Sequence, residues 1–161
     1  MTQTILVLAE EALTHPDLLN LQTLQGDEPA EVVILIPEER NESVLGQFFR
    51  HLGLLEVGEA FRSFSADDRR QDEVEARTAL TESLELLTRE GFSASGHTTT
   101  GDPVDALVEE AGRRAAVQAM VITRPHALAD TFHTDWANQA QDKLGIAVLH
   151  VYAGTGFIGD S

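Results

Sequence analysis

Two short runs near the start of the chain are continuously apolar rather than alternating. They are Ile5–Ala9 and Val32–Ile36. Strands that are buried on both faces of a parallel sheet show this pattern, because helices cover the sheet on each side. Between the two runs, residues 16–24 carry three leucines at near-helical spacing, and Gly26 follows them. The opening of the chain therefore predicts a compact strand–helix–strand unit.

The rest of the chain continues to alternate helical and strand patterns. Helices are predicted over 41–52, 67–90, 103–115 and 134–144, and strands over 92–99, 119–123 and 147–152. In the long helix predicted over 67–90, the residues expected to face inward are Ala76, Leu80, Leu84 and Leu87. In the helix predicted over 103–115, Pro103 occupies the first turn, and the residues expected on the buried face are Val104, Leu107, Val108, Ala111 and Ala115.

Five strands separated by helices predict an α/β fold, a Rossmann-like doubly wound five-stranded parallel sheet, because parallel neighbours require crossover connections. The length of 161 residues fits one domain over 1–161. Ligands of such sheets bind beyond the carboxyl ends of the strands, where the strand order reverses. This rule brings together Glu10 and Glu11, after the first strand, and residues 123–133, after the fourth.

Charge and composition exclude several classes of partner. Lys and Arg total 11 against 27 for Asp and Glu, so the formal net charge is −16, which disfavours nucleic acid and anionic membranes. Cysteine is absent, which rules out disulfides and thiolate chemistry. The first apolar run is too short for a signal sequence or a membrane span, so we expect a cytoplasmic protein.

The concentrated basic groups near the predicted crevice are Arg124, His126 and His133, which follow Thr123. They suit a small anion such as phosphate or a carboxylate, and the alternative is an ordinary solvated loop. The spacing of the histidines matches no strong metal motif, and no cofactor is expected. Glu10 and Glu11 pair two carboxylates at a strand end, although adjacent acids in a turn usually face solvent. His97 and His150 lie in predicted strands and are expected to be hydrogen-bonded structural residues.

The opening ILVLAEE, the run GDPVDALVEEA and the closing AVLHVY together resemble the universal stress protein family. The resemblance covers most of the chain through the order and spacing of these segments. It implies the five-stranded sheet of that family, which is like that of the adenine nucleotide alpha hydrolases, and commonly a homodimer.

The chain departs from the pattern of the family's nucleotide-binding members. They carry Gly-x2-Gly-x9-Gly-Ser/Thr after strand four, whereas no glycine occurs from Thr123 to Asn138 here. Pro125 removes one further amide donor, and Glu10 stands where the family has an Asp. The sequence therefore favours a non-enzymatic, non-ATP-binding regulatory or binding module. One alternative is a nucleotide- or small-anion-binding member with weak hydrolytic activity, and another is a dimeric interaction scaffold.

The last predicted strand supplies the expected homodimer interface. Its apolar residues are Val148, Leu149, Val151 and Tyr152, and it contains neither lysine nor proline. An apolar strand at the edge of an open sheet is usually covered or paired. We therefore expect two copies of the chain to meet at this strand.

Overall fold

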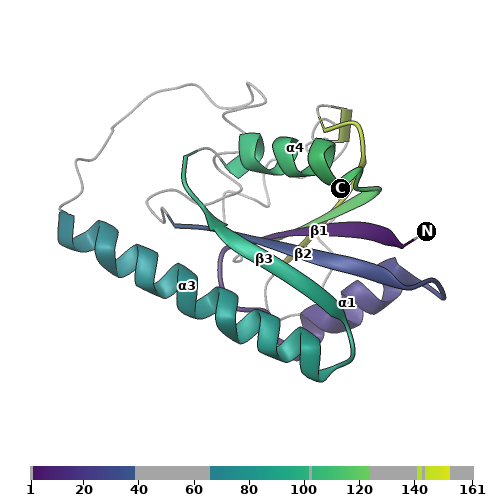
Figure 1. Ribbon diagram of the computed structural model, residues 1–161, viewed down its shortest axis with the longest axis horizontal. Helices are drawn as coiled ribbons and strands as arrows, with labels where there is room; N and C mark the ends of the chain where they lie inside the picture. The colour runs from purple at the N-terminus through teal and green to yellow at the C-terminus, as the bar shows by residue number, and fades with distance from the viewer. Residues whose placement is uncertain (1, 39–65, 102, 124–140, 143, 153–161) are drawn as a thin grey trace.

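The computed structural model describes residues 2–38, 66–101, 103–123, 141–142 and 144–152 (Figure 1). The helix predicted over 41–52 and most of the one predicted over 134–144 lie outside these residues. The elements run in the order β1 (Gln3–Ala9), α1 (His15–Gln25), β2 (Ala30–Pro37), α3 (Ala66–Arg89), β3 (Ser93–Thr99), α4 (Pro103–Arg114), β4 (Gln118–Thr123) and β5 (Ala147–Tyr152).

The five strands form one parallel sheet in the order β3-β2-β1-β4-β5. The chain builds outward from β1 to β3 and then returns to the other side of β1 as β4. The strand order therefore reverses between β1 and β4, and this is the switch point at which such sheets bind ligands. The prediction of a doubly wound five-stranded parallel sheet is confirmed.

Helices cover the sheet on both sides, with α1 and α3 on one face and α4 on the other (Figure 1). Residues 5, 7, 34, 36, 120 and 122 are buried on the face that carries α1 and α3. Residues 6, 8, 33, 35 and 121 are buried on the face that carries α4. Successive residues of β1, β2 and β4 thus enter opposite cores, which explains why their sequences are apolar without alternation.

The long helix α3 packs on the sheet through the stripe that its sequence predicts. Ala76 and Leu87 are fully buried, and Leu80 and Leu84 pack partly buried against the same core. Gly96 of β3 lies close to both the neighbouring strand and α3. A Cβ atom added there would lie 2.4 Å from the carbonyl oxygen of Ile34 and 3.1 Å from Cδ1 of Leu80. The sheet therefore requires glycine at this position for steric reasons.

The predicted buried face of α4 is correct at Leu107 and Ala111 and wrong at two positions. Val108 is 40% exposed, and Ala115 lies beyond the last helical residue, exposed and with a φ of 50°. The physical reason is that α4 contacts the sheet through a narrow stripe, and Glu110 occupies part of it at 3% exposure. None of the helices within the described ranges is both long and apolar enough to cross a membrane.

Candidate functional site

The carboxyl ends of β1 and β4 lie side by side at the switch point. Ala9 pairs with Ile122, and the backbone N–H of Glu10 donates to the Ile122 carbonyl at 3.3 Å. The fold thus brings Glu10 next to the end of β4 at Thr123, two of the predicted ligand-binding residues. Arg124, His126 and His133, the predicted basic residues, lie outside the described part of the chain.

Glu10 is buried, with 6% of its surface exposed, whereas adjacent acids in a turn are expected to face solvent. The hydrogen bond from its N–H to β4 continues the ladder one residue beyond β1 and holds the residue at the sheet. Glu11, which follows it, is partly exposed. The expectation of a solvent-facing pair is therefore wrong for Glu10, because its backbone is still held against β4 by this hydrogen bond.

The segment that leaves β1 is fixed by buried polar contacts. The N–H of Leu13 donates to the hydroxyl of Ser83 on α3 at 2.9 Å, and that hydroxyl donates to the Ala79 carbonyl at 2.7 Å. One residue later, the N–H and the hydroxyl of Thr14 both donate to the Asp17 carboxylate, at 2.8 Å and 2.9 Å. Asp17 is fully buried, so the N-terminus of α1 already carries a carboxylate of the chain itself.

Acidic groups dominate the described segments at the carboxyl ends of the strands. Glu38 follows β2, accepts a 2.6 Å hydrogen bond from the Thr98 hydroxyl, and donates its N–H to the Thr99 carbonyl at 2.8 Å. In residues 10–17 and 38, the basic side chain is His15, which is exposed, and the other charged side chains are all acids. The described part of the crevice therefore presents negative charge. Across the described residues, no three His, Asp or Glu side chains gather to hold a metal ion.

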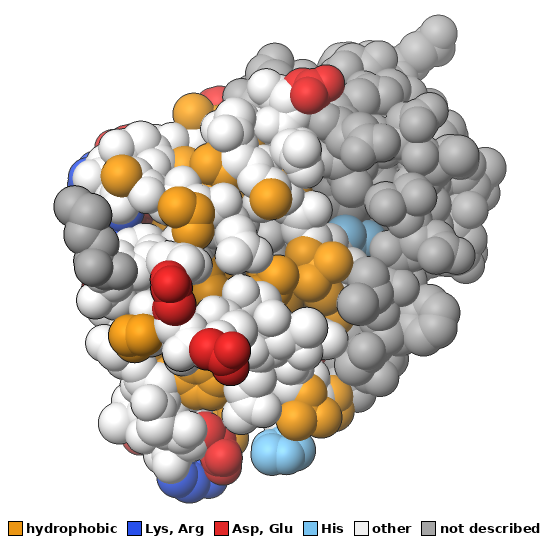
Figure 2. Space-filling view, turned by 90° about the vertical axis from the view of Figure 1, so that its right-hand side faces the viewer, with side chains coloured by type: hydrophobic (Ala, Val, Ile, Leu, Met, Phe, Trp, Pro, Cys, Tyr) orange, Lys and Arg blue, Asp and Glu red, His pale blue; other side chains and the backbone are white. Residues whose placement is uncertain are grey.

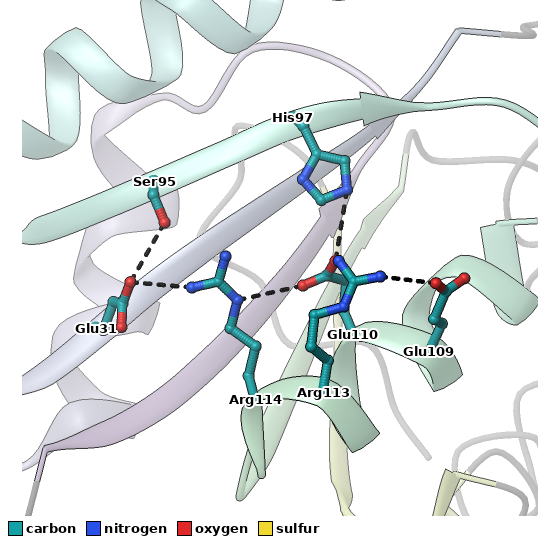
Figure 3. Close-up of polar contacts among 7 residues, drawn as sticks. All are labelled: Glu31, Ser95, His97, Glu109, Glu110, Arg113 and Arg114. Atoms are coloured by element: carbon teal, nitrogen blue, oxygen red, sulfur yellow. Dashed lines mark hydrogen bonds and ion pairs between the residues drawn. The ribbon is translucent and has the colours of Figure 1, made fainter.

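A second polar cluster joins β2, β3 and α4 (Figure 3). Its centre is the buried carboxylate of Glu110. The guanidinium nitrogens of Arg113 and Arg114 lie 2.8 Å and 3.3 Å from its oxygens and form ion pairs with it. Arg114 also reaches Glu31 at 3.3 Å, and the Ser95 hydroxyl donates to the same Glu31 oxygen at 3.3 Å. The two arginines lie in the last turn of α4, where positive charge is favoured by the helix dipole.

The cluster contains a serine, a histidine and a carboxylate, but their geometry does not make a nucleophile. The Nε2 atom of His97 lies 3.7 Å from Glu110 Oε1, which is longer than a hydrogen bond. Ser95 and His97 are two residues apart on one strand, a separation of roughly 7 Å, and the Ser95 hydroxyl is bonded to Glu31 instead. The cluster ties the end of α4 to β2 and β3, and we assign it a structural role.

Sequence reasoning missed Glu110 as a buried residue. A signal was present, because Glu110, Arg113 and Arg114 stand at the i, i+3 and i, i+4 spacing that pairs opposite charges on a helix. Of the two histidines expected to be structural, His150 is 3% exposed, while the His97 side chain is 46% exposed and faces Glu110. Both histidines lie on strands that end the strand order, β3 and β5, so a place on an edge strand does not by itself decide whether a histidine is buried.

Several solved structures share this architecture. A hypothetical protein whose biochemical function was assigned from its structure aligns with a TM-score of 0.61 at 15% identity, covering 96% of this chain and 99% of its own. The universal stress protein from Archaeoglobus fulgidus aligns at 0.52 and 15%, covering 95% of each chain. A universal stress protein solved in complex with cAMP aligns at 0.54 and 15%, covering 94% and 98%.

These similarities show that the chain has the universal stress protein fold, as the resemblance in its sequence implies. No protein-family model matches the sequence, and no curated protein matches it as a relative. The likeness at this level of identity therefore concerns the fold, and the residues of the crevice have to be judged by their own chemistry.

Proposed function

We propose that this chain is a cytoplasmic universal-stress-like regulatory or binding module of the stress response, whose crevice does not bind ATP as nucleotide-binding members of that family do. The observation that carries the proposal is the acidic character of the described half of the crevice. Glu10 is buried at the end of β1, and Glu11 and Glu38 follow the ends of β1 and β2.

Two physical effects disfavour triphosphate binding in the crevice. A triphosphate is held chiefly by backbone N–H groups in a glycine-rich turn, because a Cβ atom blocks their close approach. No glycine occurs from Thr123 to Asn138, and Pro125 lacks the donor altogether. In addition, two like charges about 4 Å apart repel by about 4 kcal/mol at an effective dielectric constant of about 20. Each carboxylate that faces the phosphates therefore weakens binding substantially.

A second candidate function is the binding of a nucleotide with a single phosphate, or of another small anion, with weak hydrolytic activity. The observation that favours it is the structural neighbour solved in complex with cAMP. A single phosphate needs fewer donors than a triphosphate, and Arg124, His126 and His133 follow β4 directly in the sequence. In this alternative they hold the phosphate beside Thr123, and Glu10 provides the acid of strand one.

Isothermal titration calorimetry separates the two candidates. We expect magnesium and ATP to give no saturable heat at submillimolar ligand, because the amide cradle is missing and the crevice is acidic. A micromolar dissociation constant for ATP would refute the first proposal. Under the second, cAMP and inorganic phosphate bind, and ATP binds more weakly than either because it brings more negative charge to the same carboxylates.

The pH dependence tests which groups hold the anion. Histidine side chains ordinarily titrate near pH 6.5, so protonated His126 or His133 would strengthen phosphate binding as the pH falls from 8 to 6. The comparison is between wild type and Arg124→Ala in a phosphate titration followed by NMR at both pH values. Equal responses of the two proteins, or no response in either, would remove the anion candidate and leave the regulatory module.

We further propose that the chain forms a homodimer through β5, which the dimeric interaction scaffold requires. Among the described residues, β5 pairs with β4 and stands at the end of the strand order. Val148 and Leu149 are partly buried and extend the two cores toward this edge. Val151 is fully buried in the core of one subunit, so a substitution there would test stability rather than association.

Leu149→Lys is therefore the informative change at the predicted interface of Val148, Leu149, Val151 and Tyr152. We expect light scattering coupled to size exclusion to show a shift from a dimer to a monomer of 17.5 kDa. The matched control is Val74→Lys on α3, where valine is already 62% exposed and the charge should leave the dimer intact. A wild-type monomer at tens of micromolar, or equal loss in both variants, would contradict an interface at β5.

A further inference from the structure

A small pocket lies at the edge of the sheet opposite the crevice, where α1 and α3 both end. Its volume is about 160 Å³, it is open to solvent, and it is lined by Gln22, Gln25, Gly26, Glu90, Gly91 and Phe92. Each helix stops at a glycine with positive φ, 65° at Gly26 and 88° at Gly91. Two helix C-termini thus meet in one concave surface.

The electrostatics of this pocket favour a cation. A helix C-terminus carries about half a negative charge from its last carbonyl groups, and here two such ends converge. The lining adds the carboxylate of Glu90 and contains no Lys, Arg or His. Arg89 lies in the last turn of α3 but is exposed and is not part of the lining, and the last turn of α1 has no basic residue.

Two acidic residues beside the pocket add to its negative electrostatic potential. Asp27 and Glu28 follow α1 immediately and are both exposed. Figure 2 views the molecule from the side on which the strands begin, and on the described surface acidic side chains stand near the middle and also toward the upper and lower ends, while Lys and Arg show at the left and lower margins. A chain with a net charge of −16 attracts cations in general, and this pocket adds a shape and a set of acceptors to that attraction.

The lining also has the chemistry to recognise one kind of cation. The side-chain amide oxygens of Gln22 and Gln25 and the Glu90 carboxylate are hydrogen-bond acceptors. Phe92 also lines the pocket, with its side chain partly buried against the core, and an aromatic ring attracts cations. Since a cavity of about 150 Å³ accommodates benzene, the volume suits a group of about six non-hydrogen atoms.

We propose that this pocket is a binding site for a small alkylguanidinium ion, distinct from the crevice at the other edge of the sheet. The planar guanidinium donates to Glu90 and to the glutamine oxygens, and its short alkyl chain lies against Phe92. The two helix ends stabilise its charge. The lining comes from the C-terminal end of α1 and from the turn between α3 and β3, so the site is independent of whether the crevice binds a nucleotide.

The test is a titration with ethylguanidinium, followed through the backbone amide shifts of Gln22, Gly26, Gly91 and Phe92 in about 0.15 M salt, which screens nonspecific attraction. We expect saturable shifts with a dissociation constant in the millimolar range. N-ethylurea, which has a similar shape without the charge, should give none. Saturable shifts with the urea, or unsaturable shifts spread over all acidic surfaces, would overturn the proposal.

Two variants locate the binding. Glu90→Gln should weaken ethylguanidinium about threefold, the factor that a surface charge interaction produces. Glu82→Gln, an exposed position two turns earlier on α3, removes the same charge away from the pocket and should have no effect. If the two variants weaken binding equally, ethylguanidinium is attracted by the overall negative charge of the protein and not by the pocket, which would refute the site. Gln22→Ala provides a second change within the lining, and an unchanged affinity in both Gln22→Ala and Glu90→Gln would also refute the site.

Discussion

Replacing Gly96 by alanine is expected to lower the free energy of unfolding by about 2–3 kcal/mol, the cost of forcing one extra carbon into a packed core. The added Cβ would lie 2.4 Å from the backbone oxygen of Ile34, which cannot rotate away because β2 is paired on both sides. Leu80 closes the other side at 3.1 Å. Chemical denaturation followed by circular dichroism measures the change.

Gly112 on α4 provides the matched control for this substitution. A Cβ atom there would meet nothing within 4 Å. Because alanine costs less backbone entropy than glycine in a helix, Gly112→Ala should raise the free energy of unfolding by about 0.5–1 kcal/mol. The two Gly→Ala changes are thus expected to have opposite signs. If Gly96→Ala is neutral or stabilising, Ile34 of β2 and Leu80 of α3 do not approach Gly96 as closely as the fold described here requires.

The sequence predicted the sheet well because the physical cause of its pattern is simple. Strands covered on both faces must be apolar at every position, so Ile5–Ala9 and Val32–Ile36 identified β1 and β2 directly. The stripe of α3 was equally clear, since Ala76 and Leu87 belong to a long helix with an acidic outer face. Such features depend on short stretches of chain and on periodicity alone.

The burial of polar residues was harder to predict, because it depends on partners distant in the sequence. Glu110 is buried in a helix whose apolar period favours Val108 instead; Arg113 and Arg114 of the same helix pair with its carboxylate, and His97 of β3 lies 3.7 Å from it. Glu10 is held against the sheet because β4, more than a hundred residues later, accepts a hydrogen bond from its backbone N–H. A buried carboxylate needs such partners, and one sequence does not reveal which distant residues provide them.

Part of the candidate site could likewise be predicted from the sequence, and part could not. The rule for ligands at the switch point placed Glu10 beside the end of β4, and the observed strand order agrees. The acidic character of this end of the sheet was only partly predictable, since Glu38 comes near Glu10 through the pairing of β1 with β2 and not through adjacency in sequence. The pocket between α1 and α3 left no motif, because its lining combines residues 22–26 with residues 90–92.

Replacing Ser83 by alanine is the second change for which we expect a large effect. The Ser83 hydroxyl is the buried acceptor for the Leu13 N–H, which lies in the segment that leads from Glu10 to α1. Without it, that N–H has no partner among the hydrogen bonds that fix the segment, and an unsatisfied buried donor costs about 1–3 kcal/mol. The free energy of unfolding should fall by this amount, and the Leu13 amide should exchange with deuterium faster.

Thr81→Ala on the same helix separates this effect from a change in the helix itself. Both hydroxyls donate to the carbonyl four residues earlier, Thr81 to Arg77 and Ser83 to Ala79, but Thr81 is exposed and receives no bond from another element. Its removal should change stability by less than about 0.5 kcal/mol. Equal effects of the two substitutions, or an unchanged exchange rate at Leu13 in Ser83→Ala, would mean that α3 does not hold the crevice segment in place. In that case the position of Glu10 would depend on its hydrogen bond to β4 alone.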